Sequence, residues 1–364
     1  MGIYRVTKQS NDATLSATSL ADLELWAELV RRDHPFLGQL QLQPDGKYQT
    51  RAMSLDAATG EVVRCLAEEF QRIPADEFPM MYCAWGRCRV GSTALANLFG
   101  SAGLPSFFQP VKAVFRNVLT DSERAPWQLP SAADEPHIFC KDVGGPYLLA
   151  ECLYIPLQML LEAGYPADRL HLIMLDRDPA RSLASWFTKW SDRVARDVLV
   201  RNFVVASLNA FRVAAYAKRH GVAVSHYIHE ASKAPTQAAA ALFRHLGLAD
   251  RYTPNAVTDW RGVEAFDTEK SRLIFTKEPA VYFVAGVHRA APTYSYQPRG
   301  LGSVTESDLD LLDRMGVAAL YRACAESCTS ELDLPASVAE TVFGSAATAD
   351  ESETQQRLQI VPVA

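Results

Sequence analysis

Hydrophobic positions along the middle of the chain form two kinds of stretch. Short continuous apolar runs, which favour buried strands, occupy residues 80–85, 106–108, 137–141, 170–175 and 222–228. Apolar residues recur at helical spacing from residue 92 onward and over residues 111–119, 147–163, 192–220 and 236–246. Strands separated by helices pair in parallel and form a sheet that helices cover. We therefore predict an α/β fold whose ligands bind at the carboxyl ends of the strands.

The two ends of the chain lack this alternation. Residues 1–75 contain two amphipathic stretches, 19–30 and 55–73, which predict a helical N-terminal extension. The α/β domain is expected over residues 76–335, with a helix at 306–325. Within this domain, residues 252–300 carry aromatic residues and prolines without a period, so we expect a lid there. Residues 345–364 are polar and small, which predicts a disordered tail.

Composition changes this picture in three ways. The 364 residues carry a formal net charge of −6, which argues against a nucleic-acid-binding protein because such domains are usually basic. The 7 cysteines include no CxxC pair, which favours reduced thiols in a cytoplasmic protein over disulfides, and we expect no metal site. A secretory signal is not expected, and no apolar run reaches the roughly 18 residues that a membrane span requires.

The stretch that carries the most chemical information runs from Gly86 to Thr93. It follows a predicted strand, contains Gly86 and Gly91, and precedes a predicted helix, which is the layout of an anion-binding loop. The glycine spacing is that of a P-loop, but Ser92 stands where the nucleotide-hydrolysing version needs Lys. Because Arg89 supplies a positive charge earlier in the loop, the segment predicts a phosphate or sulfate site. An ordinary glycine turn is the alternative.

A second informative stretch covers residues 170–190. A buried strand leads to Arg177, and Ser185 follows eight residues later in the next helix, which begins after Asp178. This spacing allows the guanidinium and the hydroxyl to reach one phosphate. The alternative is a surface arginine that pairs with Asp176 or Asp178, and a serine that packs against a neighbouring element.

Together the two stretches resemble the signatures of the sulfotransferase family that uses 3′-phosphoadenosine 5′-phosphosulfate, PAPS. The family's R-S-G-S/T-T loop, which holds the 5′-phosphosulfate, corresponds to Arg89, Val90, Gly91, Ser92 and Thr93. Its R-D/N-P signature with a later serine, which holds the 3′-phosphate, corresponds to Arg177, Asp178, Pro179 and Ser185. A late Arg-Gly pair that completes the 3′-phosphate site resembles Arg299 and Gly300, and the resemblance spans about residues 78–325.

The resemblance implies a P-loop-like fold and an activity. The expected enzyme moves a sulfuryl group from PAPS to a hydroxyl, amine or N-hydroxyl of a small molecule by in-line displacement, with residues 252–300 as an acceptor-binding segment. The expected partner is this small-molecule acceptor, such as a natural product, with no nucleic acid and no membrane, and a homodimer is left open. Aromatic residues that can line the acceptor pocket are Trp186, Trp190, Trp260, Phe266, Tyr282, Phe283, Tyr294 and Tyr296.

The chain departs from the family at the catalytic base. The position of the family's His is Val143, and the position of its acidic alternative is Gln109. We predict Asp142 as the base, with Lys141 and Arg89 stabilising the leaving phosphate, because a base must reach the acceptor proton and a phosphate needs positive charge. Thr93 and Lys112 are predicted to assist the leaving phosphate. Less favoured or open candidates for the base are His137, Glu151, His226, His229 and His288.

Two other functions stay open at this point. A P-loop kinase or nucleotidase would explain the glycine spacing and the acidic end of the 170–176 stretch, but not Arg177 with Ser185. A sulfotransferase-like binding protein without activity would explain why neither usual base is present.

Overall fold

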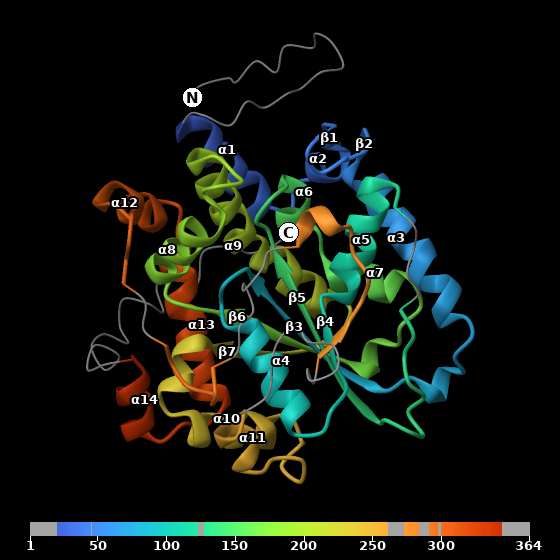
Figure 1. Ribbon diagram of the computed structural model, residues 1–364, viewed down its shortest axis with the longest axis vertical. Coiled ribbons are helices and arrows are strands. Elements are labelled where there is room, and N and C mark those ends of the chain that lie inside the picture. The colour runs from blue at the N-terminus through green and yellow to red at the C-terminus, as the bar shows by residue number, and fades with distance from the viewer. Residues whose placement is uncertain are drawn as a thin grey trace.

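A single six-stranded parallel sheet forms the centre of the molecule. The computed structural model describes residues 20–44, 46–122, 127–260, 273–283, 291–297 and 300–343. The strand order is β7-β6-β3-β5-β4-β8, and every neighbouring pair is parallel (Figure 1). The strands are β3 (Met80–Arg87), β4 (Ser106–Phe108), β5 (His137–Gly144), β6 (Leu170–Asp176), β7 (Ala223–Ile228) and β8 (Leu273–Phe275). The predicted α/β class is therefore confirmed.

The sheet differs from the prediction in its edges and in strand length. The five predicted strands are present, but β3 and β5 continue beyond the predicted ends at residues 85 and 141, to Arg87 and Gly144. The sixth strand, β8, was not predicted, and it pairs with β4 across more than 160 residues of sequence. It lies inside the segment 252–300 that lacks a sequence period. Part of that segment thus completes the sheet.

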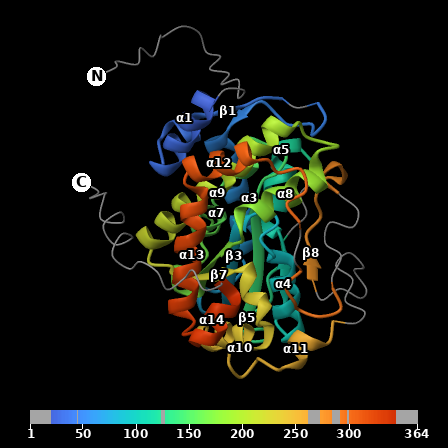
Figure 2. The ribbon, with the colours of Figure 1, turned by 90° about the vertical axis from the view of Figure 1, so that its left-hand side faces the viewer.

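Side chains of β3 alternate between two hydrophobic clusters, one on each face of the sheet. Tyr82 and Ala84 belong to a cluster with α4 (Ser92–Ser101), α10 (Pro235–His245) and α11 (Asn255–Thr258). Met81 and Trp85 belong to the other cluster, with α5 (Pro110–Thr120) and α9 (Arg196–Arg219). Figure 2 shows α4 and α9 on opposite sides of the strands. The side chains of the neighbouring strand β5 alternate in the same way, with Lys141 opposite Ala84 and Asp142 opposite Trp85.

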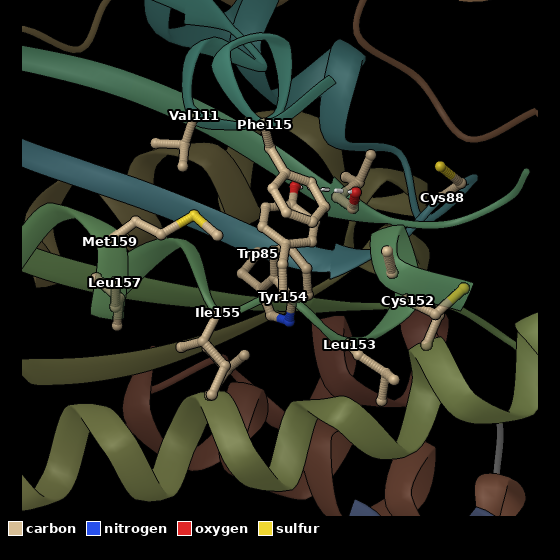
Figure 3. Packing of buried hydrophobic residues seen from close by; sticks show 14 of the residues in the cluster. Trp85, Cys88, Val111, Phe115, Cys152, Leu153, Tyr154, Ile155, Leu157 and Met159 are labelled. Carbon is tan, nitrogen blue, oxygen red and sulfur yellow. Dashed lines mark hydrogen bonds between the residues drawn. The ribbon is translucent and has the colours of Figure 1, made fainter. Parts of the chain in front are cut away.

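The second cluster is built around Trp85 (Figure 3). The ring of Tyr154 meets Trp85 edge-on with centroids 5.1 Å apart, and it stacks on Phe115 at 5.2 Å. Tyr154 ends α6 (Leu149–Leu153), and α7 (Pro156–Glu162) begins two residues later, so the single helix predicted at 147–163 is wrong. The residue before a proline avoids helical backbone angles, which explains the interruption.

The N-terminal part of the described chain packs on the same core as the sheet. It consists of α1 (Leu20–Arg31), α2 (Phe36–Gln39), the short pair β1 (Gln41–Leu42) and β2 (Met53–Ser54), and α3 (Leu55–Phe70). Trp26 of α1 and Val62 of α3 lie in the cluster that contains Trp85. The predicted boundary at residue 75 stays a prediction, and residues 1–19 lie outside the described part.

Three further helices, α12 (Glu306–Arg314), α13 (Val317–Glu331) and α14 (Ala336–Phe343), follow the sheet. The single helix predicted at 306–325 is interrupted at Gly316, whose φ of 72° ends α12. Within the described residues, one helix, α9, has the length and composition of a membrane span, and 61% of its most apolar window is buried inside the molecule. Burial of this kind is typical of the core helix of a soluble protein.

Candidate functional site

A cavity of about 210 Å³ lies at the carboxyl edge of the sheet. Its lining includes residues that follow five different strands: Cys88 after β3, Gln109 after β4, Pro146 after β5, Arg177 after β6 and His229 after β7. Parallel strands bring the segments that follow them to one edge, so the cavity occupies the place where α/β sheets bind ligands.

The glycine loop begins later than the sequence predicts. Gly86 lies inside β3, and a Cβ atom on it would lie 2.3 Å from the carbonyl oxygen of Leu175 on β6. Gly86 therefore permits close strand packing and does not form the turn, which corrects the prediction. Gly91 does form the turn: its φ is +82°, and a Cβ atom there would lie 2.5 Å from Nδ1 of His229.

The loop leads directly into the N-terminus of α4, which starts at Ser92. Gly91, Ser92 and Thr93 line the cavity, so the first turn of the helix faces it. Val90 is buried in the hydrophobic cluster below the loop and is only 2% exposed. Val90 thus anchors the loop from beneath, and the lack of a Cβ atom on Gly91 leaves room for the ring of His229.

The two informative stretches of the sequence meet at this loop. Arg89 Nε donates a hydrogen bond to Ser185 Oγ at 2.9 Å, and Arg177 Nη1 donates one to the carbonyl oxygen of Arg89 at 3.3 Å. Ser185 comes from α8 (Pro179–Trp190), where Asp178 caps the helix by accepting from the N–H of Arg181. The structure thus brings Arg89, Arg177 and Ser185 together, but Ser185 accepts from the side chain of Arg89, whereas the sequence predicted that Ser185 and Arg177 hold one phosphate.

A buried ion pair that sequence reasoning missed supports this convergence. Arg87 Nη1 lies 2.5 Å from Asp176 Oδ1, and Arg87 Nη2 donates to the carbonyl oxygen of Arg177 at 2.6 Å. Burial raises the pKa of Asp176, against the opposing effect of the Arg87 charge. The brace joins the end of β3 to the end of β6, so Asp176 is occupied and does not pair with the side chain of Arg177. The sequence showed Asp176 at the end of a predicted strand, but it did not show that Arg87, 89 positions away, is its partner.

Lys141 lies at the same end of the cavity. Its ammonium group donates to Thr93 Oγ1 at 3.2 Å and lies 3.8 Å from the centroid of the Phe108 ring. The residue is 1% exposed, and burial lowers the pKa of Lys141 to about 7. An anion bound at the loop would favour the charged form, because opposite charges at short distance stabilise each other.

Asp142 lies on the opposite face of the sheet. Since β5 continues to Gly144, the side chains of Lys141 and Asp142 alternate. Asp142 Oδ1 accepts from the backbone N–H of Lys112 at 2.8 Å and from the Tyr154 hydroxyl at 3.4 Å. Burial raises its pKa to about 7. Within the described part of the chain, Asp142 does not belong to the cavity lining, so the structure does not bring the predicted base to the loop.

The remaining candidates for the base separate into groups. His226 is bonded to Glu331, and His137 starts β5 at the edge of the sheet away from the cavity. His229 lines the cavity beneath Gly91, and its ring lies 5.4 Å from that of Tyr296. His288 and Arg299 lie outside the described residues, as does Phe266. Gly300 is exposed and does not belong to the described lining of the cavity.

The other end of the cavity contains a buried cluster of charges and aromatic rings. Arg116 of α5 pairs with Glu151 at 2.6 Å and with Glu278 at 2.7 Å, and the Tyr282 ring lies 4.0 Å from its guanidinium. Lys112 Nζ donates to the carbonyl oxygen of Val143 at 3.0 Å. Sequence reasoning missed Arg116 and Glu278, because no local pattern relates two residues 162 positions apart.

The predicted aromatic lining is only partly present. Trp190, Trp260, Tyr282 and Phe283 line the cavity. Trp186 is buried in the core, where its indole N–H donates to the carbonyl oxygen of Cys88 at 2.8 Å and so holds the start of the loop. Tyr294 is also buried, and its hydroxyl is hydrogen-bonded to that of Tyr227.

Comparisons of the chain with models of protein families, with curated proteins and with solved structures find no match. Functional inference therefore rests on the cavity itself.

Proposed function

We propose that the protein is a cytoplasmic sulfotransferase that moves a sulfuryl group from PAPS to a small-molecule acceptor. The observation that carries the proposal is the hydrogen bond between Arg89 and Ser185, 96 positions apart, together with the bond from Arg177 to the Arg89 carbonyl. Two guanidinium groups beside one loop, from the residues that precede α4 and α8, suit a ligand with two separate anionic groups. PAPS has such groups, a 3′-phosphate and a 5′-phosphosulfate.

The donor end of the cavity supplies what sulfuryl transfer requires. The loop N–H groups, Arg89 and Thr93 would hold the 5′-phosphosulfate, and Arg177 would hold the 3′-phosphate, as in a P-loop-like site. Lys141 would stabilise the negative charge that develops on the leaving phosphate, because a fixed positive charge interacts more strongly with a developing negative charge in a buried site than in water. The acceptor would then approach from the end that contains Arg116 and Tyr282.

A P-loop kinase is less well supported. A kinase of this kind needs a loop lysine and a strand-end acid that holds Mg²⁺. Ser92 stands in the position of the lysine, and Asp176 already accepts from Arg87 and from the backbone N–H of Arg177 at 2.6 Å. Asp176 therefore links β3 to β6 through Arg87, and this role differs from that of an acid that holds Mg²⁺.

The melting temperature with different nucleotides separates the candidate functions. Adenosine 3′,5′-bisphosphate without Mg²⁺ should raise it, because a ligand that binds only the folded state stabilises that state. If ATP with Mg²⁺ raises it and the bisphosphate does not, the protein is a kinase-like enzyme. If the bisphosphate binds and labelled PAPS transfers sulfate to no hydroxyl, amine or N-hydroxyl acceptor, the protein is a binding protein.

A further inference from the structure

We propose that Glu278 takes the proton from the acceptor, and that the acceptor is a hydroxyl group on a flat ring. This inference rests on the proposed sulfuryl transfer. Glu278 lies in the segment 252–300, where the sequence offered only His288 as an open candidate for the base.

The position of Glu278 in the cavity is the first argument. Among the described lining residues, Glu278 is the one carboxylate and His229 the one imidazole. His229 lies against Gly91 at the nucleotide end, where a Cβ on Gly91 would lie 2.5 Å from its ring. Glu278 lies beside Arg116 on α5, at the end left for the acceptor. A base must reach the acceptor proton, so position favours Glu278.

Glu278 is also held in place. Asn117 donates to the carbonyl oxygen of Lys277 at 2.9 Å, which fixes the segment after β8 against α5. Arg116 Nη1 donates to Glu278 Oε2 at 2.7 Å. The side chain of Glu278 is 28% exposed, whereas those of Arg116 and Glu151 are 4% and 0% exposed. The carboxylate thus combines a fixed orientation with access to the cavity.

The second carboxylate of the cluster, Glu151, is less accessible to an acceptor than Glu278, because its side chain is 0% exposed. Glu151 is fixed by the backbone N–H of Tyr147 at 3.2 Å and stays paired with Arg116.

The rings around Glu278 indicate the shape of the acceptor. The centroid of the Tyr282 ring lies 4.0 Å from the Arg116 guanidinium, and that of Tyr147 lies 5.7 Å from it. Trp190 and the half-exposed Phe283 also line the cavity. Aromatic side chains pack best against flat rings. A phenol, or a ring that carries an alcohol, fits this end better than a sugar or a polyanion.

In the proposed step, the acceptor oxygen attacks sulfur with a lone pair and a new O–S bond forms. The bond between sulfur and the bridging oxygen of PAPS breaks, and its electron pair stays on the phosphate of adenosine 3′,5′-bisphosphate. The proton of the hydroxyl moves to Glu278 and later leaves to water.

Acceptors of different acidity test this role. With PAPS and 2-phenylethanol or phenol, Glu278→Gln should lower the transfer rate by about 10²–10⁴-fold, which is the usual contribution of a general base. With 4-nitrophenol, which ionises without help, the loss should be below about tenfold. Glu278→Asp keeps the carboxylate, so its transfer rate should lie between those of the wild type and Glu278→Gln. The matched control is Glu326→Gln, on the exposed face of α13.

Binding of adenosine 3′,5′-bisphosphate separates this inference from the proposed function. Absence of binding to the wild type would refute the sulfotransferase itself. Equal loss with all three acceptors in Glu278→Gln, or no loss, would refute Glu278 as the base. A wild type that binds the bisphosphate and transfers to none of the three probes would refute the flat-ring acceptor. If Glu278→Gln melts at a much lower temperature than Glu326→Gln, the transfer rates of Glu278→Asp with the same three acceptors replace those of Glu278→Gln in this test.

Discussion

The two ends of the cavity are built in different ways. The end proposed to bind the donor consists of a loop and a helix N-terminus, with Arg177 at the end of the neighbouring strand, and its backbone groups lie within a few residues of strand ends. The acceptor end consists of the side chains of Arg116, Glu151 and Glu278, which come from two helices and the segment after β8. Backbone groups thus form much of the first end, with the Arg87–Asp176 and Arg89–Ser185 contacts as support, whereas side chains form the second.

This difference teaches where a local sequence can specify a site. Backbone N–H groups and a left-handed glycine need only the right residue types in a row. A cluster of paired charges needs the complete fold, because each partner is useful only when the others arrive. The donor loop can therefore be recognised in the sequence, whereas the acceptor end becomes visible only in the fold.

The largest effect is expected from Arg87→Leu, which leaves Asp176 buried without its ion pair. Removing one partner of a buried pair costs about 3–5 kcal/mol of unfolding free energy. Urea unfolding measures it, and Arg72→Leu, which breaks the exposed pair with Glu69, should cost at most about 1 kcal/mol. Similar small losses in both variants would show that the brace between β3 and β6 does not support the donor end.

The pH dependence of bisphosphate affinity tests Lys141 at the donor end. Its pKa is about 7 in the free protein, and a bound phosphate should raise it. Below pH 7 the ammonium is charged in both states, so affinity is highest there. Above pH 7 the free protein must take up a proton to bind, and affinity should fall by up to about tenfold per pH unit.

Calorimetric titrations at pH 7, 8 and 9 at constant ionic strength measure this fall, since the phosphates, with a second pKa of about 6, are largely ionised over this range. Lys141→Met removes the titrating group, so its weaker affinity should change less with pH. Affinity that stays level or rises in the wild type would place Lys141 away from the bound phosphate.

The smallest effect is expected from Asp142→Asn, which compares the base predicted from the sequence with Glu278. The Asn oxygen can still accept from the Lys112 N–H, so the cost in unfolding free energy should stay within about 1 kcal/mol. Transfer to phenol should fall at least about tenfold less than in Glu278→Gln. The reverse order in a phenol assay would restore Asp142 as the base.

Much of the sheet was predictable, because its strands are short apolar runs with helices between them. β8 was not, since three residues in an aperiodic segment become a strand only when β4 offers an open edge. The donor loop was predictable apart from Gly86, whose role depends on the neighbouring Leu175 carbonyl. Strand alternation already implied that Lys141 and Asp142 point to opposite faces, but the strand was expected to end before Asp142.

Calorimetric binding of adenosine 3′,5′-bisphosphate and adenosine 5′-monophosphate without Mg²⁺ tests the central claim most directly. The two ligands differ by the 3′-phosphate, which Arg177 is proposed to hold. A charge-assisted contact is worth about 1.5–3 kcal/mol, so the bisphosphate should bind at least about tenfold more tightly, and Arg177→Ala should abolish the difference. Equal affinity of the two ligands for the wild type, or a difference that survives in a folded Arg177→Ala variant, would contradict the two-phosphate site.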